Sequence, residues 1–300
     1  MKAYLILEDG TVFTGTSIGS QREVISEIVF NTSMTGYLEV LTDPSYAGQA
    51  VVMTYPLIGN YGICRQDMES LKPWPDGYIV RELSRIPSNF RCEDTIQNFL
   101  EENDIPGICG IDTRALTKLL REKGTMNGMI TTKEYSDLSE PISRMKAYTV
   151  AGVVMATTTK KKYVLPGNGK KVALMDFGAK KNIARSLNER GCEVTVYPAD
   201  TPAEEVLAAN PDGIMLSNGL VIQRKMLRSS KRSKKCMTPM YRSLQSAGTS
   251  VNGTGKRYGY LQIKIRPQRR KSSCKRSGDR KSLHFFPEPW LRSRYQHCKA

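Results

Sequence analysis

The chain has 300 residues, of which 39% are hydrophobic and 25% charged, and its formal net charge is +16. This length accommodates two domains of ordinary size, and no apolar run reaches the roughly 18 residues that a membrane span needs. The opening stretch MKAYLILEDG predicts a β-strand and a turn rather than a signal peptide, because two acidic residues follow the apolar run at once.

The net positive charge comes from one end of the chain. Residues 220–300 hold 22 Lys and Arg against two acidic residues, whereas residues 1–219 hold 23 basic and 27 acidic residues. Both histidines also lie beyond residue 219, and the seven cysteines form no CxxC pair and no metal-ligand spacing. We therefore expect no metal site and a reduced, cytoplasmic location.

Residues 1–156 predict a β-rich α/β domain. The stretch AYLILEDGTVFTGTSIG alternates apolar and polar residues around a central Asp-Gly pair, which is a hairpin signal. Helical spacing follows in residues 95–105. The clearest helix is residues 112–124, which begin with an Asp N-cap, carry apolar residues at helical spacing and end at a Gly.

Residues 157–219 predict a linker followed by a second, incomplete domain. Residues 157–171 are polar and contain Gly and Pro, which indicates a linker. Residues 172–219 follow the order strand, helix, strand, helix, strand, and the first strand, VALMDF, is the continuous apolar run expected of a buried parallel strand. This order predicts the start of a doubly wound parallel sheet.

Residues 220–300 lack any such pattern. They contain Lys/Arg runs and scattered polar residues, with no sustained period of 2 or 3.6. Such a segment buries too little apolar surface to offset its ordering entropy, so we expect an irregular, disordered basic tail. The stretch NGTGKR approaches a phosphate-binding loop, but Ser250 and Arg257 occupy positions where that motif needs Gly and Ser or Thr.

Four stretches of the first 219 residues carry a resemblance to a known family. Together they resemble the small, glutamine-hydrolysing subunit of carbamoyl-phosphate synthase. The stretches are FNTSMTGYLEVLTDPSYAGQAVVMTYPLIGNYGI (30–63), GIDTRALTKLLREKGTMNGMI (110–130), VALMDFGAKKNIARSLNERGCEVTVYPA (172–199) and PDGIMLSNG (211–219). The resemblance implies a small-subunit N-terminal domain followed by the start of a class I glutamine amidotransferase domain.

The same resemblance implies an activity and a partner. In that family a Cys nucleophile, helped by a His and a Glu, releases ammonia from L-glutamine. The large subunit then combines the ammonia with bicarbonate and ATP to give carbamoyl phosphate for arginine and pyrimidine biosynthesis. ATP and Mg would therefore be used by the partner large subunit. We expect no cofactor bound by this chain and no membrane contact.

Two residues match glutamine-contacting positions of the family. Ser45, in TDPSYAGQ, supplies a hydroxyl, and Gly219, in SNG, allows backbone N–H groups to approach the substrate closely. Without the resemblance, both would pass for ordinary turn residues. No catalytic residue is assigned, because neither the nucleophile motif CLGHQ nor the distal HPE of the family is present.

The departure from the family pattern begins at Leu220, where NGLVIQ replaces the expected NGPGDP. Back-translation with one base restored regroups residues 220–225 into PGDPKK, and a second restored base near residue 248 produces CLGHQ. Our hypothesis is that residues 220–300 are an out-of-frame translation, from a sequencing error or a pseudogene. Under this hypothesis, none of the three cysteines of this segment is a catalytic residue.

Three functions follow from these observations. The first is the glutaminase subunit of carbamoyl-phosphate synthase, which we expect to be inactive in the chain as translated. The second is a non-enzymatic module whose basic tail binds nucleic acid, although the frame hypothesis leaves only non-specific binding through that tail. The third is a subunit that keeps only its partner-binding role.

Overall fold

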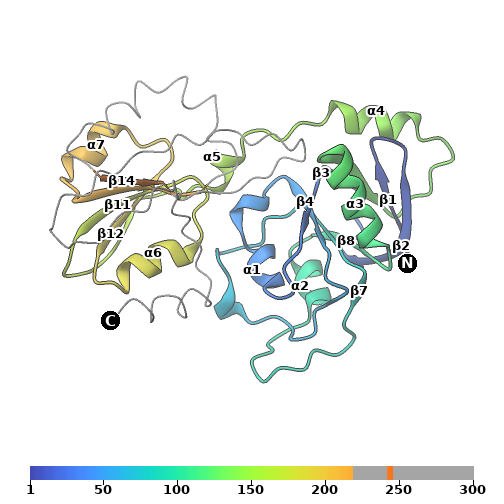
Figure 1. Cartoon of the computed structure of the whole chain (residues 1–300), viewed down its shortest axis with the longest axis horizontal. Coiled ribbons are helices and arrows are strands. Elements are labelled where there is room, and N and C mark those ends of the chain that lie inside the picture. Colours follow the sequence, from blue (N-terminus) through green and yellow to red (C-terminus); the bar gives the residue numbers. More distant parts are fainter. Residues whose placement is uncertain (219–241, 246–300) are drawn as a thin grey trace, which may run out of the picture.

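The computed structural model describes residues 1–218 and 242–245. It contains two lobes side by side (Figure 1), a β-barrel built from the first part of the chain and a second sheet with helices on both faces. The predicted class, a β-rich α/β domain followed by the start of a doubly wound sheet, is confirmed.

The barrel closes in the strand order β1-β2-β8-β6-β4-β3-β9. Its strands are β1 (Lys2–Leu7), β2 (Val12–Gly19), β3 (Val24–Asn31), β4 (Gln49–Met53), β6 (Gly77–Ile79), β8 (Pro106–Cys109) and β9 (Met126–Thr131). The run β3-β4-β6-β8 is parallel and the remaining pairs are antiparallel. The predicted hairpin is confirmed, since β1 pairs with β2 across a turn in which Gly10 has φ +88°.

Alternate residues of the barrel strands face the inside and the outside of the barrel. In β4, Ala50 and Val52 belong to the cluster inside the barrel, whereas Val51 and Met53 belong to a cluster outside it. This is the two-residue period of a strand that is buried on both faces. The outer core is covered by α1 (Tyr37–Leu41) and α2 (Ile96–Glu102).

Helix α3 (Thr113–Lys123) covers the barrel interior with Leu116 and Leu120. The predicted caps are confirmed, because the Asp112 side chain accepts a hydrogen bond from the Ala115 N–H at 2.9 Å and Gly124 ends the helix. Helix α4 (Ser139–Ala147) packs against β1 and β9. Short elements complete this lobe: β5 (Leu57–Ile58), β7 (Glu82–Leu83) and the 3-10 helices η1 (Pro44–Tyr46) and η2 (Arg65–Asp67).

The second sheet has the order β10-β12-β11-β13-β14. Its strands are β10 (Tyr163–Leu165), β11 (Lys171–Asp176), β12 (Glu193–Pro198), β13 (Gly213–Leu216) and β14 (Arg242–Gln245), and all pairs except β10-β12 are parallel. Helix α5 (Val153–Thr157) precedes this sheet in the chain. Helices α6 (Lys181–Asn188) and α7 (Ala203–Ala208) pack on opposite faces, against Leu174 and against Ala173 respectively.

Two sequence interpretations differ from the structure. Residues 157–171 are not only a linker, because β10 lies within them and forms an antiparallel edge of the second sheet. Residues 220–300 are not irregular throughout, because β14 extends the sheet beside β13. The other residues of the basic tail, 220–241 and 246–300, lie outside the described part of the chain. No helix among the described residues is long and apolar enough to cross a membrane.

Candidate functional site

The candidate site lies at the carboxyl ends of β11 and β13, where the second lobe meets the barrel. The chain leaves β11 through α6 to β12 on one side, and then returns through α7 to β13 on the other side of β11. The strand order therefore reverses between β11 and β13. In open parallel sheets, ligands bind in the crevice that such a reversal leaves at the carboxyl ends of the strands.

The loop after β11 is held rigidly. One Asp176 carboxylate oxygen accepts hydrogen bonds from the N–H groups of Gly178 (2.9 Å) and Ala179 (2.7 Å). Gly178 has φ +106°, a conformation that side chains of L-residues rarely adopt. The fully buried Ser217, just after β13, accepts a hydrogen bond from the Phe177 N–H at 2.9 Å and so joins the two strand ends.

The barrel contributes the segment from Thr42 to Tyr46. Asp43 accepts a hydrogen bond from the Ser45 N–H at 2.9 Å, and Pro44 occupies the first position of η1, where its missing N–H costs nothing. This turn presents the Ser45 hydroxyl to the second lobe. The Asn218 side-chain amide donates a hydrogen bond to the Ser45 Oγ at 3.0 Å.

An ion pair crosses the boundary beside that contact. The Lys180 ammonium lies 2.8 Å from the Asp43 carboxylate, whose side chain is only 8% exposed. Burial opposes the charged form of Lys180, but the neighbouring Asp43 carboxylate outweighs it and raises the pKa of Lys180. Lys180 therefore stays protonated, and its charge is neutralised by Asp43.

A second contact anchors α6 to the barrel. Glu69, which is 8% exposed, accepts hydrogen bonds from the side-chain amide (2.6 Å) and backbone N–H (3.3 Å) of Asn182, while its carbonyl accepts one from the Lys181 N–H at 2.7 Å. The Glu69 N–H in turn donates to the Thr42 hydroxyl at 2.9 Å. The N-terminal end of α6 is thus capped by a carboxylate of the other lobe, which complements the helix dipole. We call the residues Asp43, Ser45, Glu69, Lys180, Asn182 and Asn218 the domain seam.

The structure brings one of the two predicted site residues into this seam. Ser45 contacts Asn218, the residue directly before Gly219, whereas Gly219 itself lies outside the described residues. The glutamine-binding role of both stays a prediction. Lys180, Glu69 and Asn218 were not singled out from the sequence. The only sequence signal for Lys180 is its place in a loop that follows a buried strand.

Asn218 brings an uncharged hydrogen-bonding group to the seam. Asn218 Oδ1 is buried and has no hydrogen-bond partner among the described residues. Within the described part of the chain, no cluster of His, Cys, Asp or Glu could hold a metal ion. The cysteines of that part are free thiols: Cys64, Cys92, Cys109 and Cys192. Burial raises the pKa of the Cys109 thiol, which disfavours its nucleophilic thiolate form.

Each lobe matches the model of a known protein family. Residues 5–130 match the family described as carbamoyl-phosphate synthase small chain, CPSase domain, and residues 173–241 match glutamine amidotransferase class-I. The carbamoyl phosphate synthase small chain of Clostridium perfringens is 54% identical over 219 residues, which cover 73% of this chain and 62% of that protein. This chain contains a partial carbamoyl-phosphate synthase small chain.

Other small chains are similarly close. Those of Listeria monocytogenes and Bacillus cereus are 50% and 51% identical over 219 residues, covering 73% of this chain and 60% of each relative. The chain thus spans about three fifths of the length of the curated small chains that it matches. Among solved structures, an aminopeptidase from Aneurinibacillus sp. strain AM-1 is 11% identical, and the match covers 71% of this chain and 56% of the aminopeptidase chain. Its TM-score of 0.27 is too low for a structural argument.

Proposed function

We propose that this chain comes from the glutamine-hydrolysing small subunit of carbamoyl-phosphate synthase, which supplies ammonia to a large subunit. The observation that carries the proposal is the approach of Ser45 to Asn218 at the carboxyl ends of β11 and β13. It brings a hydroxyl of the small-chain domain to the crevice of the amidotransferase domain. The two matched domains therefore form one composite binding site.

The proposed substrate of this site is L-glutamine. The Ser45 hydroxyl and the backbone N–H groups around Gly219 are the groups that hold it. Beside the Ser45 hydroxyl, the seam presents the uncharged side-chain amide of Asn218, and neutral donors and acceptors of this kind suit a carboxamide. A glycine at position 219 allows a closer approach of the backbone to the substrate than any other residue.

We propose that the chain as translated does not hydrolyse glutamine. Glutamine hydrolysis in this family needs a Cys nucleophile on a rigid turn with a base within hydrogen-bond reach. None of the four described cysteines belongs to the seam, and the three in residues 220–300 lie outside the described residues. Substrate binding without a nucleophile yields little rate enhancement.

The frame hypothesis is part of this proposal. In its favour, the alignments with the small chains extend over 219 residues, which is the number of residues that precede Leu220. Against it, the amidotransferase match reaches residue 241, and β14 pairs in parallel with β13. Resequencing of the DNA decides the matter: we expect single-base losses near codons 220 and 248. Codons that do not regroup into PGDP and CLGHQ refute it.

The remaining parts of the proposal follow from the subunit role. The partner is the large subunit, which uses ATP and Mg, while this chain binds no cofactor. The location is cytoplasmic, and the product serves arginine and pyrimidine biosynthesis. The alternative, nucleic-acid binding by the basic tail, depends on residues that lie outside the described part, and no described residue favours it.

The experiment combines the full chain with the large subunit of the same organism. We expect the two to copurify, and we expect carbamoyl phosphate from added ammonia but none from glutamine. The ammonia reaction shows that the large subunit is active in the assay. Calorimetry with glutamine, beside a Ser45→Ala variant, measures substrate binding alone. Failure to copurify contradicts the subunit role, and product from glutamine contradicts the proposed inactivity.

A further inference from the structure

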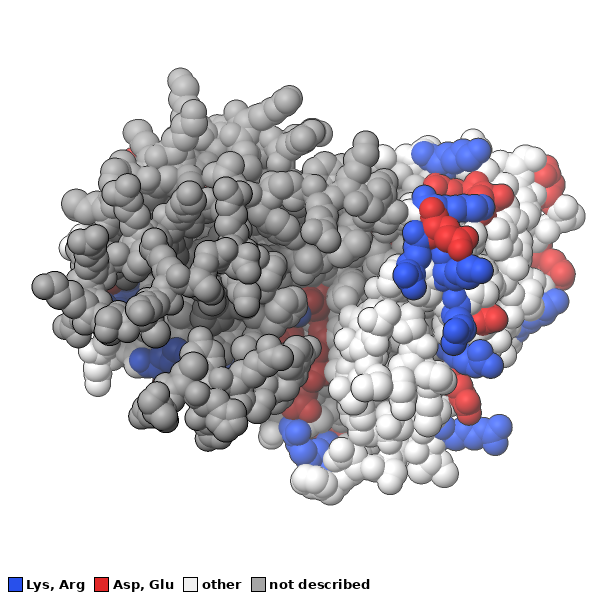
Figure 2. Space-filling view, viewed as in Figure 1, with Lys and Arg blue, Asp and Glu red and all other residues white. Residues whose placement is uncertain are grey.

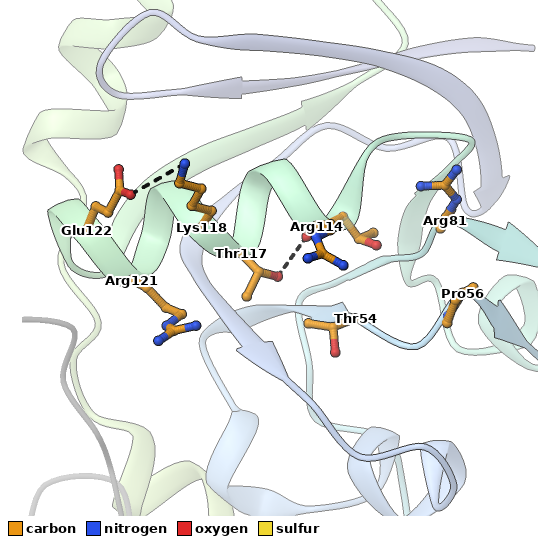
Figure 3. Close-up of a pocket in the computed structure, with 9 residues that line it drawn as sticks. Thr54, Pro56, Arg81, Arg114, Thr117, Lys118, Arg121 and Glu122 are labelled. Carbon is orange, nitrogen blue, oxygen red and sulfur yellow. Dashed lines mark hydrogen bonds and ion pairs between the residues drawn. The ribbon is translucent and has the colours of Figure 1, made fainter.

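A basic groove runs along α3 on the barrel lobe, away from the seam. Its volume is about 840 Å³. It is lined by Thr54, Pro56, Arg81, Thr113, Arg114, Thr117, Lys118, Arg121 and Glu122. Figure 3 shows the lining side chains of α3 beside Thr54, with Arg81 and Pro56 at one end. Four of these nine residues are basic and one is acidic, which gives the groove a net positive charge.

The sequence of α3 separates its apolar and basic faces. Leu116 and Leu120 enter the barrel core, so Arg114, Lys118 and Arg121 fall on the opposite side at spacings of four and three residues. Residues at these spacings form one stripe on a helix. At 1.5 Å rise per residue, the stripe from Arg114 to Arg121 is about 10 Å long.

These charges are almost unpaired within the described part of the chain. No ion pair there involves Arg81, Arg114 or Arg121, and Lys118 makes only an exposed contact of 3.9 Å with Glu122. Like charges at helical spacing destabilise an isolated helix slightly. Arg121 lies in the last turn of α3, where a cation suits the helix dipole, but no ion pair among the described residues accounts for Arg81 or Arg114.

The surroundings make this concentration of charge unusual. Residues 1–156 contain 20 acidic and 14 basic residues, so the lobe as a whole is negative. Four of the 14 basic residues nevertheless line this one groove. Figure 2 shows Lys and Arg side chains in a band on the barrel lobe, with Asp and Glu side chains interspersed among them. A positive surface on a negative lobe attracts and orients an anionic partner.

We infer that the groove along α3 is a docking site for an acidic segment of a partner protein, which under the function proposed above is the large subunit. The basic side chains are exposed and spread over two turns of helix, so one small anion could contact only a minority of them. A polypeptide segment with several carboxylates matches both the length and the charge of the stripe. Arginine pairs with carboxylates through two parallel hydrogen bonds, which favours such an interface.

The test measures the affinity of the full chain for the large subunit. The groove variant is Arg114→Glu combined with Arg121→Glu. The control is Lys133→Glu combined with Lys146→Glu, which makes the same charge change at exposed positions of the same lobe outside the groove. Both variants keep residues 220–300, so any binding by the basic tail is equal. We expect the groove variant to bind about 30-fold to 100-fold more weakly, and the control to stay within about threefold of the parent.

Each outcome has a distinct meaning. Equal weakening of groove and control variants overturns the inference, because net charge then explains the effect. A groove variant that binds like the parent also overturns it, while the subunit role stands. A parent chain that does not bind the large subunit overturns the subunit role and the inference together. If the groove variant instead loses binding of ATP, measured by calorimetry, and keeps its affinity for the large subunit, the groove is a small-anion site.

Discussion

The contact between Glu69 and Asn182 predicts how strongly the two lobes support each other. We propose to replace Glu69 by Ala and Asn182 by Ala, singly and together. The Glu69 carboxylate is buried and accepts two hydrogen bonds from Asn182, at 2.6 Å and 3.3 Å. Removal of Glu69 leaves the side-chain amide and the backbone N–H of Asn182 without their acceptor, at the N-terminal end of α6.

The magnitude follows from the chemistry of the pair. A hydrogen bond to a charged group contributes about 1.5–3 kcal/mol, and a lost helix cap costs about 1 kcal/mol. Because the backbone carbonyl of Glu69 still accepts the Lys181 N–H in the variant, we expect a net loss of about 2–3 kcal/mol in the local stability of α6. That loss corresponds to a roughly 30-fold to 150-fold larger equilibrium constant for local opening of the helix.

Hydrogen–deuterium exchange of peptides covering α6 measures this opening directly. The control is Glu82→Gln, which changes an exposed carboxylate of β7 in the barrel lobe that makes no ion pair among the described residues. It should leave exchange in α6 unchanged. In the double-mutant cycle, the coupling between Glu69 and Asn182 should reach about 1 kcal/mol or more. Exchange in α6 that stays within threefold of the parent after Glu69→Ala would show that the lobes do not support each other through this contact.

Two further predictions concern single residues. Burial works against the charged form of Glu23, but hydrogen bonds from Tyr135 and Arg144 outweigh it and lower its pKa from 4.5. The stability that this carboxylate contributes is present above its pKa in the unfolded chain and disappears as the pH falls through its pKa in the folded protein. The difference in thermal midpoint between the parent and Glu23→Gln should therefore shrink as the pH falls from about 6 to about 3. A constant difference contradicts this. Gly178→Ala should lower the free energy of unfolding by about 1–3 kcal/mol and the thermal midpoint by several degrees. The reason is that Gly178 has φ +106° and that a Cβ there would lie 3.0 Å from Thr157 Oγ1. An unchanged melting curve would exclude strain at this turn.

Local signals made α3 predictable. Its N-cap, its apolar spacing and its terminal glycine all lie within residues 112–124, and the structure uses each of them. The hairpin of β1 and β2 was predictable for the same reason, since its turn residues stand between the two strands. Closure of the barrel was not, because β1 also pairs with β9, whose residues lie more than 100 positions away.

The edges of the second sheet escaped prediction for a different reason. The three residues of β10 are all hydrophobic, but this run is too short to stand out within a polar stretch, and Tyr163 and Val164 are about half exposed in the fold. Its pairing with β12 fixes it as the edge strand of the second sheet. Strand β14 has no apolar pattern in its sequence, RSLQ, and is formed by pairing with β13.

The seam could be predicted only in part. Ser45 was singled out through a family resemblance, and its turn is encoded locally by Asp43 and Pro44. Its contact with Asn218 joins residues 173 positions apart, and the pairing of Lys180 with Asp43 likewise crosses from one lobe to the other. Such contacts depend on how two domains pack, which no local pattern in the sequence encodes.

Barrel closure also fixes an order of events during synthesis. Strand β1 leaves the ribosome before the other strands of the barrel, yet its second neighbour, β9, ends only at Thr131. At about 5–20 residues per second, roughly 6–25 s pass between the appearance of the two strands. Throughout that interval Leu5 and Leu7, which are fully buried in the finished barrel, lack part of their enclosure. The nascent chain therefore offers chaperones an apolar strand edge at β1 until β9 has emerged.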